Sequence, residues 1–275
     1  MSDFLQTMAS RSAERAAAVS ASFRSSDFDK PVVPLALGKF DVIAEIKDKS
    51  PAEGDLANAD GARRGGDDRN RRAQNYAQGG AVAISVLTEP TRFAGELAHL
   101  EEVVAAVPGT PVMRKDFLVE PVQLLEARKA GASGVLLIIS ILSDDKLREM
   151  LRCTWEHDMF VLLESFSEDD LARASRLFDN SADQGRARSD QLLIGVNTRN
   201  LRTLEVDTDR LQRLAPALPT ARCVAESGLL VPDDAAAVAG WGYQMALVGS
   251  ALMRSDDPAT LVSAMREAGS ARMAS

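Results

Sequence analysis

Short apolar runs alternate with longer amphipathic segments along most of the chain. Each apolar run has the length of a β-strand, and the segment that follows repeats its apolar residues with a helical period. The runs predict eight strands, which are Asp41–Lys47, Val82–Leu87, Val112–Lys115, Gly134–Ile139, Phe160–Glu164, Leu192–Asn197, Arg222–Glu226 and Met245–Gly249.

The segments between these runs predict the helices. A first amphipathic segment runs from Phe4 to Val19, and Pro31 and Pro34 then interrupt the pattern. Strands that alternate with helices form a parallel sheet through crossover connections. Eight such units predict an α/β fold, a (β/α)8 TIM barrel with an extra N-terminal helix. The barrel helices are expected at Arg69–Gln78, Glu96–Val107, Pro121–Ala130, Asp144–His157, Glu168–Phe178, Asp209–Leu214, Asp233–Ala239 and Pro258–Ala268.

The length of the chain fits one such barrel. Its 275 residues are close to the roughly 250 that the fold typically uses. We therefore expect a single domain, with an N-terminal helical extension over residues 1–39 and the barrel over residues 40–270. Aromatic residues make up only 5% of the chain, so the core must consist mainly of Ala, Val, Leu and Ile, which suit parallel strands buried on both faces.

Two polar stretches interrupt the compact pattern. Asn58–Arg72 is highly charged and follows the first strand, and its end overlaps the start of the first barrel helix. Asn180–Asp190 precedes the sixth strand. Both predict solvated loops. Because the first leaves the C-terminal face of the barrel, it is either a disordered loop or a lid.

Charge and cysteine usage limit the partners. The formal net charge is −8, which argues against nucleic acid because binding to a phosphate backbone needs a basic surface. Cys153 and Cys223 lie far apart and outside any CxxC pair, so we expect buried free thiols. The N-terminus has no apolar segment typical of a secretory signal, and no stretch is apolar enough to span a membrane. We expect a cytoplasmic monomer or weak homodimer.

Reactive side chains follow most of the predicted strands. In a (β/α)8 enzyme the catalytic groups come from the C-terminal strand ends. Glu45 and Lys47 lie two apart and so point to one side of the first strand. A buried charge is costly without a partner, so such residues are usually paired or functional. The other strand ends carry Arg114, Lys115, Asp116, Phe117, Glu164, Asn197, Arg199, Glu226, Ser227, Gly228, Gly249 and Ser250.

This set suits general acid–base chemistry. A lysine near other cations or in a dry pocket can titrate low enough to donate a proton, and a carboxylate can accept one. No cysteine lies at a C-terminal strand end, and His99 and His157 fall in predicted helices, away from the mouth. A Ser/His/Asp triad, a Cys/His dyad and a His-rich metal site are therefore disfavoured.

The last two strands end in small residues. Ser227-Gly228 and Gly249-Ser250 let backbone N–H groups approach an anion. The loops after strands seven and eight are the usual phosphate site of these barrels. We therefore expect a small phosphorylated substrate.

Several long segments resemble the indole-3-glycerol phosphate synthase family, over almost the whole barrel. They are IAEIKDKSPAEG, AISVLTEPTRF, PVMRKDFLVEPVQLLEARKAGASGVLLI, VLLES, IGVNTRNLRTLEVD, VAESG and ALVGSALM, in the family's order. The resemblance implies that the N-terminal helix lies over the barrel mouth. It also implies ring closure of 1-(o-carboxyphenylamino)-1-deoxyribulose 5-phosphate with loss of CO2 and water, in tryptophan biosynthesis and without a cofactor or metal.

The resemblance also implies roles for the strand-end residues. Lys115 is the general acid on the carbonyl oxygen, and Glu164 is its partner in the dehydration. Lys47 contacts the substrate carboxylate or acts as an acid itself, and Glu45 orients both lysines. The remaining roles are positioning by Asn197 and Ser227 with Glu226 and Arg199 nearby, phosphate binding by Ser50, Gly228, Gly249 and Ser250, and an apolar pocket from Phe93 and Phe117.

The chain also departs from the usual family pattern. Ala52 stands where a serine is usual, the loop after the first strand is unusually charged, and PTRFAGE replaces an aromatic-rich segment. These departures keep open a paralogue that acts on a modified anthranilate-derived substrate in secondary metabolism. A non-catalytic barrel is a further alternative, against which the complete lysine and glutamate set argues.

Overall fold

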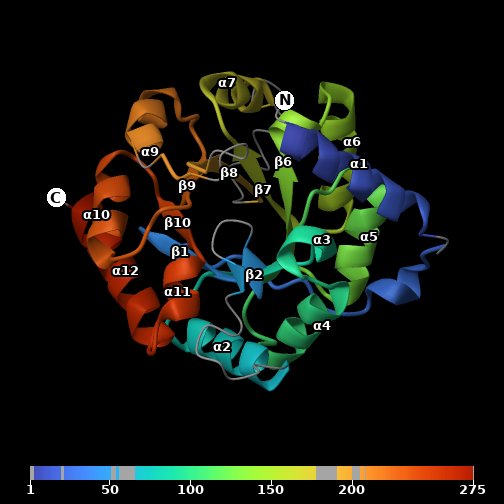
Figure 1. Ribbon diagram of the computed structural model, residues 1–275, viewed down its shortest axis with the longest axis horizontal. Helices are drawn as coiled ribbons and strands as arrows, with labels where there is room; N and C mark the ends of the chain where they lie inside the picture. The colour runs from blue at the N-terminus through green and yellow to red at the C-terminus, as the bar shows by residue number, and fades with distance from the viewer. Residues whose placement is uncertain are drawn as a thin grey trace.

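The computed structural model describes residues 3–19, 22–50, 54–55, 66–177, 191–199, 205–207 and 209–274. Eight parallel strands close into a barrel, in the order β1-β10-β9-β8-β7-β6-β5-β4 (Figure 1). The predicted strands are confirmed to within one residue at each end. They are β1 (Asp41–Ile46), β4 (Ala83–Leu87), β5 (Val112–Lys115), β6 (Gly134–Ile138), β7 (Phe160–Ser165), β8 (Leu192–Asn197), β9 (Arg222–Glu226) and β10 (Met245–Val248).

Helices surround this barrel, as the alternating pattern predicts (Figure 1). Short elements that follow strands at the C-terminal face are β2 (Lys49–Ser50) with β3 (Gly54–Asp55), α3 (Pro90–Phe93), η2 (Ile139–Ile141) and α11 (Ser250–Arg254), whereas η3 (Ala215–Ala217) precedes β9. The outer helices are α2 (Gly66–Gln78), α4 (Leu97–Ala106), α5 (Pro121–Ala130), α6 (Asp144–Glu156), α7 (Glu168–Leu177), α9 (Asp209–Leu214), α10 (Pro232–Gly240) and α12 (Pro258–Met273).

The start of the first barrel helix differs from the prediction, which placed it at Arg69. Helix α2 begins at Gly66, so residues 66–72 of the expected charged loop are helical. Arg72 explains this, because its guanidinium is buried, pairs with Asp68 one turn earlier at 3.5 Å and donates to the carbonyls of Leu252 and Met253. Residues 58–65 and 180–190 of the two predicted loops lie outside the described residues.

The N-terminal helix α1 (Asp3–Ala17) lies on the rim of the barrel mouth beside β5 and β6 (Figure 1). Leu5 and Met8 are buried in the cluster that fills the barrel interior. The ring of Phe4 meets the ring of Phe117, just beyond β5, edge-on at 6.0 Å. The helix therefore covers one side of the mouth.

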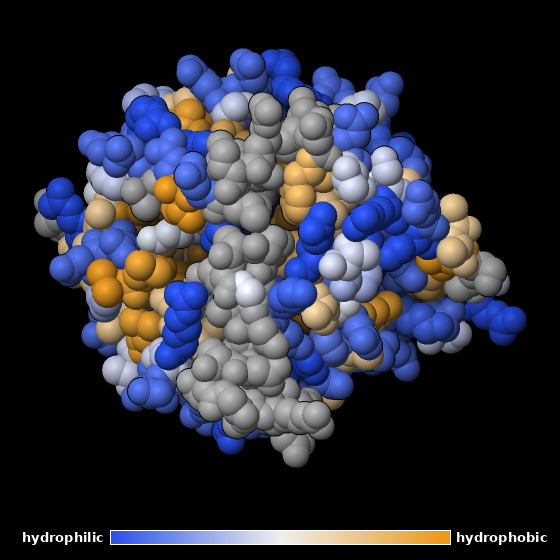
Figure 2. Space-filling view, in the orientation of Figure 1, coloured by the Kyte–Doolittle hydropathy of each residue, from blue (hydrophilic) through white to orange (hydrophobic). Residues whose placement is uncertain are grey.

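The visible surface of the described residues is mixed. Hydrophilic side chains are interspersed with smaller hydrophobic groups on the face drawn in Figure 2. Within the described ranges, no helix has the length and apolar character needed to cross a membrane. Both cysteines are free thiols, as expected, although Cys153 is only half-buried while Cys223 is buried. Burial raises the pKa of the Cys223 thiol to about 12.

Candidate active site

Strand periodicity places the reactive residues inside the barrel. The interior cluster contains Ile43 of β1, and residues two and four positions further on share its side of the strand. These are Glu45 and Lys47, while Val42 and Ala44 face the outer helices. The same step of two leads from interior residues to Lys115 on β5, Glu164 on β7, Asn197 on β8, Glu226 on β9 and Gly249 just beyond β10.

Glu45 joins the two lysines of the mouth. Its Oε2 accepts a hydrogen bond from Lys115 Nζ at 2.7 Å, and its Oε1 lies 3.2 Å from Lys47 Nζ. Burial alone would raise the pKa of Glu45, but the two ammonium groups outweigh it and lower that pKa to about 2. Glu45 is therefore ionised at neutral pH and holds both cations in one place.

Lys115 is surrounded by carboxyl groups. Besides Glu45, its Nζ lies 3.7 Å from Glu226 Oε2. Burial lowers the pKa of Lys115, but the charges of Glu45, Glu226 and Glu164 together raise it above its usual value. This direction is opposite to the low-titrating lysine that the sequence suggested, because the nearest charged neighbours are anions. Lys115 therefore holds its proton at neutral pH.

Glu164 and Glu226 form a buried carboxyl pair opposite the lysines. Their relative exposures are 3% and 0%. Burial raises the pKa of both groups, and the charge of Glu164 raises the pKa of Glu226 further. Two carboxylates cannot donate to each other, and neither oxygen of Glu226 has a hydrogen-bond donor among the described residues. Burial and the neighbouring carboxyl group therefore favour the protonated form of this pair.

Two glycines make room for this cluster. A Cβ on Gly195 of β8 would collide with Glu226 Oε1, and one on Gly249 would come within 2.5 Å of Glu45 Oε1. The prediction assigned Gly249 to phosphate binding alone and missed Gly195. A glycine inside an otherwise apolar strand often marks a close approach by another group, which is the signal that could have found it.

Asn197, Ser227 and Arg199 are joined by hydrogen bonds at the mouth. Asn197 Oδ1 accepts from Ser227 Oγ at 3.0 Å and from the backbone N–H of Arg199 at 2.8 Å. Ser227 and Gly228 both have positive φ, at 69° and 81°. A non-glycine residue in this region is uncommon and often marks a functional site. The turn after β9 therefore aims Ser227 at Asn197 rather than away from it.

A pocket of about 330 Å³ opens beside these residues. Glu45, Lys47 and Lys115 share it with Ser227, Gly228, Gly249, Ser250, Arg199 and Arg254. The structure thus brings Glu45, the two lysines and three predicted phosphate residues to one cavity, whereas Glu226 does not line it. The sequence missed Arg254, whose position at the end of α11 gave no signal in the strand pattern.

The other predicted residues lie beside this pocket or outside the description. Phe93 and Phe117 pack on each other, with ring centroids 6.4 Å apart, near α1. They do not line the pocket, and neither do Glu164 and Asn197. The backbone of Ser50 belongs to β2, but its side chain lies outside the described residues.

A histidine lies nearer to the mouth than the sequence suggested. His99 Nδ1 is 3.9 Å from Asp48, which lies two residues beyond β1 and also pairs with Arg69 at 2.7 Å. Burial, and then the charge of Arg69, lower the pKa of His99. In the part of the chain that the structure describes, no three His, Cys, Asp or Glu side chains are grouped to hold a metal ion.

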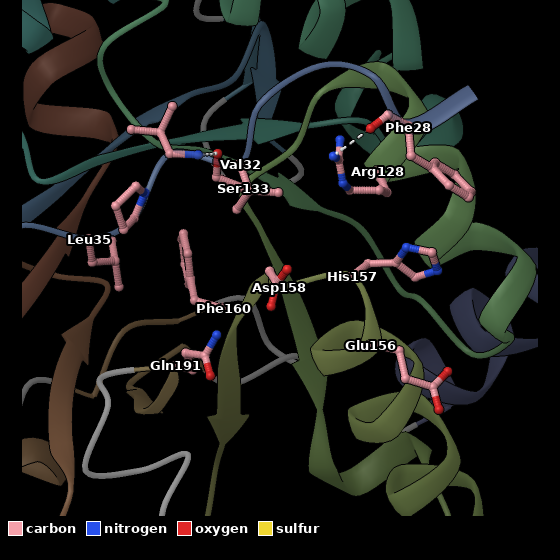
Figure 3. Close-up of a pocket in the computed structure, with 12 residues that line it drawn as sticks. Phe28, Val32, Leu35, Arg128, Ser133, Glu156, His157, Asp158, Phe160 and Gln191 are labelled. Carbon is pink, nitrogen blue, oxygen red and sulfur yellow. Dashed lines mark hydrogen bonds between the residues drawn. The ribbon is translucent and has the colours of Figure 1, made fainter. Parts of the chain in front are cut away.

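A second pocket, of about 730 Å³, lies at the opposite end of the barrel. Phe160 and Gln191, at the starts of β7 and β8, line it together with Ser133, Arg128 and His157 (Figure 3). Arg128 donates to the carbonyl of Phe28 at 2.8 Å, which ties the N-terminal segment across this face. The pocket is larger than the first but holds none of the predicted site residues, so its size does not make it the catalytic site.

Fold and site together define a (β/α)8-barrel enzyme with a lysine–glutamate cluster at the C-terminal ends of its strands. The model of the family "Indole-3-glycerol phosphate synthase" matches residues 5–265, and the chain belongs to this family.

Named relatives agree with this assignment, and a solved structure shares the fold alone. The indole-3-glycerol phosphate synthase of Nocardioides sp. (strain ATCC BAA-499 / JS614) is 44% identical over 254 residues, 90% of each chain. That of Mycobacterium leprae (strain Br4923) is 43% identical over 230 residues, 83% of this chain and 77% of the relative. A 3-hexulose-6-phosphate synthase structure from Salmonella typhimurium, with a TM-score of 0.60, 14% identity and coverage of 86% and 99%, shares the fold.

Proposed function

We propose that the protein is an indole-3-glycerol phosphate synthase of tryptophan biosynthesis. It closes the indole ring of 1-(o-carboxyphenylamino)-1-deoxyribulose 5-phosphate and releases CO2 and water. The observation that carries the proposal is Glu45, which holds Lys47 and Lys115 in the mouth of the barrel. Membership of the family supports the choice of substrate.

Ring closure needs an acid at the carbonyl oxygen of the substrate. The ring carbon that bears the carboxylate attacks the ribulose carbonyl carbon, and the oxygen gains a proton as the new C–C bond forms. Lys115 supplies this proton, because the carboxyl groups around it keep it charged at neutral pH. Lys47 pairs with the substrate carboxylate until that group leaves as CO2.

Dehydration needs an acid and a base on the same intermediate. The hydroxyl formed in the first step leaves as water after it receives a proton, and the neighbouring methylene carbon loses one. Glu164 is suited to this exchange because burial raises its pKa, so that it can hold a proton beside Glu226. Asn197 and Ser227 orient the intermediate.

We assign the phosphate to the small residues that follow β9 and β10 in this pocket. Gly228, Gly249 and Ser250 line it there, and we assign Ser50 to the same group from the family pattern. Phe93 and Phe117 are the apolar contacts of the anthranilate ring. The enzyme works in the cytoplasm as a monomer or weak homodimer, which suits its two free thiols.

Two substitutions separate the steps. Lys115→Met removes the first acid, and we expect it to abolish formation of indole-glycerol phosphate while the circular dichroism spectrum stays that of the folded protein. Glu164→Gln leaves Lys115 in place and should release CO2 faster than it forms indole. Full indole formation by Lys115→Met would reject the assignment of the acid.

A further inference from the structure

The N-terminal helix holds the catalytic end of β5 through a buried ion cluster. We propose that Arg15 is a positioning residue for Lys115, acting through Asp116. This inference rests on the proposed function, because it assigns Arg15 a part in the placement of the ring-closing acid.

The contact between the helix and the barrel is short and largely buried. Arg15 Nη2 lies 2.6 Å from Asp116 Oδ1, and Arg15 Nη1 lies 3.8 Å from Glu89 Oε1. The side chains of Asp116 and Glu89 are fully buried, and that of Arg15 is 29% exposed. A buried carboxylate needs such a cation, because unpaired burial of a charge is costly.

Asp116 connects this contact to both sides of Lys115. Its Oδ2 accepts from Thr88 Oγ1 at 3.0 Å and lies 3.2 Å from Arg114 Nη2. Its Oδ1, which faces Arg15, also accepts from the backbone N–H of Phe117 at 2.8 Å. The Asp116 carboxylate therefore contacts Arg114, which precedes Lys115 in β5, and Phe117, which follows it on the turn beyond β5.

Two more contacts keep α1 in register with this turn. The hydroxyl of Ser12 accepts from the side-chain amide of Gln123 at 2.8 Å, in the first turn of α5. Phe4 packs edge-on against Phe117 at the other end of the helix. The helix thus spans the turn from Phe117 to α5, and Arg15 provides its charged contact beside Lys115.

The position of the Lys115 ammonium group depends on both ends of its long side chain. Glu45 holds the ammonium group of Lys115, whereas Asp116 holds the backbone on which that side chain is mounted. Loss of Arg15 removes one of the two cations that pair with Asp116 in the described structure and leaves Arg114 as the other, so the helix side of the turn is no longer held. A displacement of about 1 Å at a reacting group can cost on the order of 100-fold in rate.

Arg266 provides a matched control at the opposite end of the barrel. Its Nη2 lies 3.2 Å from Asp41 Oδ1, and its side chain is 35% exposed while that of Asp41 is fully buried. Asp41 begins β1, far from the strand ends that carry the site. Arg266→Met therefore breaks a comparable arginine–aspartate pair without touching the turn beyond β5.

The experiment compares kcat, KM and thermal unfolding for the wild type, Arg15→Met, Arg15→Lys and Arg266→Met, with rates corrected for the folded fraction. We expect Arg15→Met to lower kcat by at least about tenfold, with a smaller change in KM, and Arg15→Lys to restore part of the loss. Arg266→Met should lower the unfolding temperature and leave kcat unchanged. An unchanged kcat in Arg15→Met, or equal losses in the two Met variants, would overturn the proposal.

A readout without turnover separates this proposal from the proposed function. The Nζ resonance of Lys115, identified by its loss in Lys115→Met, should shift in Arg15→Met and stay in place in Arg266→Met. If the wild type forms no indole-glycerol phosphate, the function fails, while this shift still decides whether Arg15 positions Lys115. An unchanged resonance in Arg15→Met would overturn the positioning role.

Discussion

At the residue scale, the site contains one ionised carboxyl group, Glu45, and one buried carboxyl pair in which the protonated form is favoured. Glu45 and the Glu164–Glu226 pair are all buried, yet their pKa values move in opposite directions. The difference is the distance to the lysines: Glu45 contacts both ammonium groups directly, whereas Glu226 lies 3.7 Å from Lys115 and faces another carboxyl group. Local charge therefore decides which glutamate carries a proton.

The raised pKa of Glu226 predicts that this residue lowers the free energy of unfolding at neutral pH. Above the ordinary glutamate pKa of 4.5, the unfolded chain loses this proton first, so stability falls as pH rises through the window up to the folded pKa. Glu226→Gln keeps the shape and removes the ionisable group, so it should stabilise the protein at pH 7 while it lowers kcat. Urea unfolding at pH 7 measures this, and a destabilised Gln variant would contradict it.

Glu45 predicts the opposite dependence on pH. Its pKa falls from 4.5 to about 2 on folding, so its ionisation contributes stability that is complete above pH 4.5 and is lost as the pH drops towards 2. The contribution is on the order of 3 kcal/mol. Between pH 2 and 5, the free energy of unfolding should therefore change more steeply with pH for the wild type than for Glu45→Gln. Equal slopes would argue against the pairing of Glu45 with the two lysines.

At the element scale, strand periodicity explains what the sequence could and could not predict. A period of two is enough to place Glu45 and Lys47 on one face, because both lie on β1. The meeting of Glu164 with Glu226 depends on the register of β7, β8 and β9, in which Glu164 pairs with Gly195 and Asn197 pairs with Glu226. Register between strands is a tertiary property, so no local pattern reveals it.

The same limit explains the missed residues. Arg15 meets Asp116 across 101 positions of chain, and Arg254 reaches the pocket from a helix after the last strand. His99 was expected away from the mouth because it falls in a helix. That helix was predicted correctly, but the sequence did not predict that Asp48 would lie beside His99. The family pattern, by contrast, named residues that line the pocket, because its motifs lie on the strand ends themselves: Glu45, Lys47, Lys115, Arg199, Ser227, Gly228, Gly249 and Ser250.

A substitution at Gly195 tests whether the packing of β8 against Glu226 matters for activity. Because a Cβ there would overlap Glu226 Oε1, Gly195→Ala should displace the carboxyl pair and lower kcat/KM by about 100-fold. Gly109→Ala is the control, since a Cβ at that loop position has no atom of the described structure within 4 Å. It should change stability by less than about 0.5 kcal/mol. Equal activities in the two variants would exclude the steric role of Gly195.

At the scale of the whole molecule, the barrel separates stability from chemistry along its axis. The strand C-termini carry the lysine–glutamate cluster, whereas at the N-terminal ends the ring of Phe160 packs over Gly134 beside the second pocket. The pocket at the N-terminal strand ends is larger, but none of the predicted site residues line it. Function is therefore expected to respond to changes at one end only.

Phe160→Leu tests this separation. Phe160 is 4% exposed, and shortening a buried aromatic side chain removes contacts that the core cannot fully replace, so we expect a loss of about 1–3 kcal/mol in the free energy of unfolding. kcat measured on the folded protein should stay within about twofold of the wild type. A large loss of kcat at full folding would show that the two ends are coupled.

The central claim is that this mouth forms an indole ring with loss of one carboxyl group. Its most direct measurement is the simultaneous detection of indole fluorescence and released CO2 from the purified protein and 1-(o-carboxyphenylamino)-1-deoxyribulose 5-phosphate. We predict equal amounts of indole-3-glycerol phosphate and CO2 from the wild type, and neither from Lys115→Met. Failure of the folded wild type to form the indole would contradict the account.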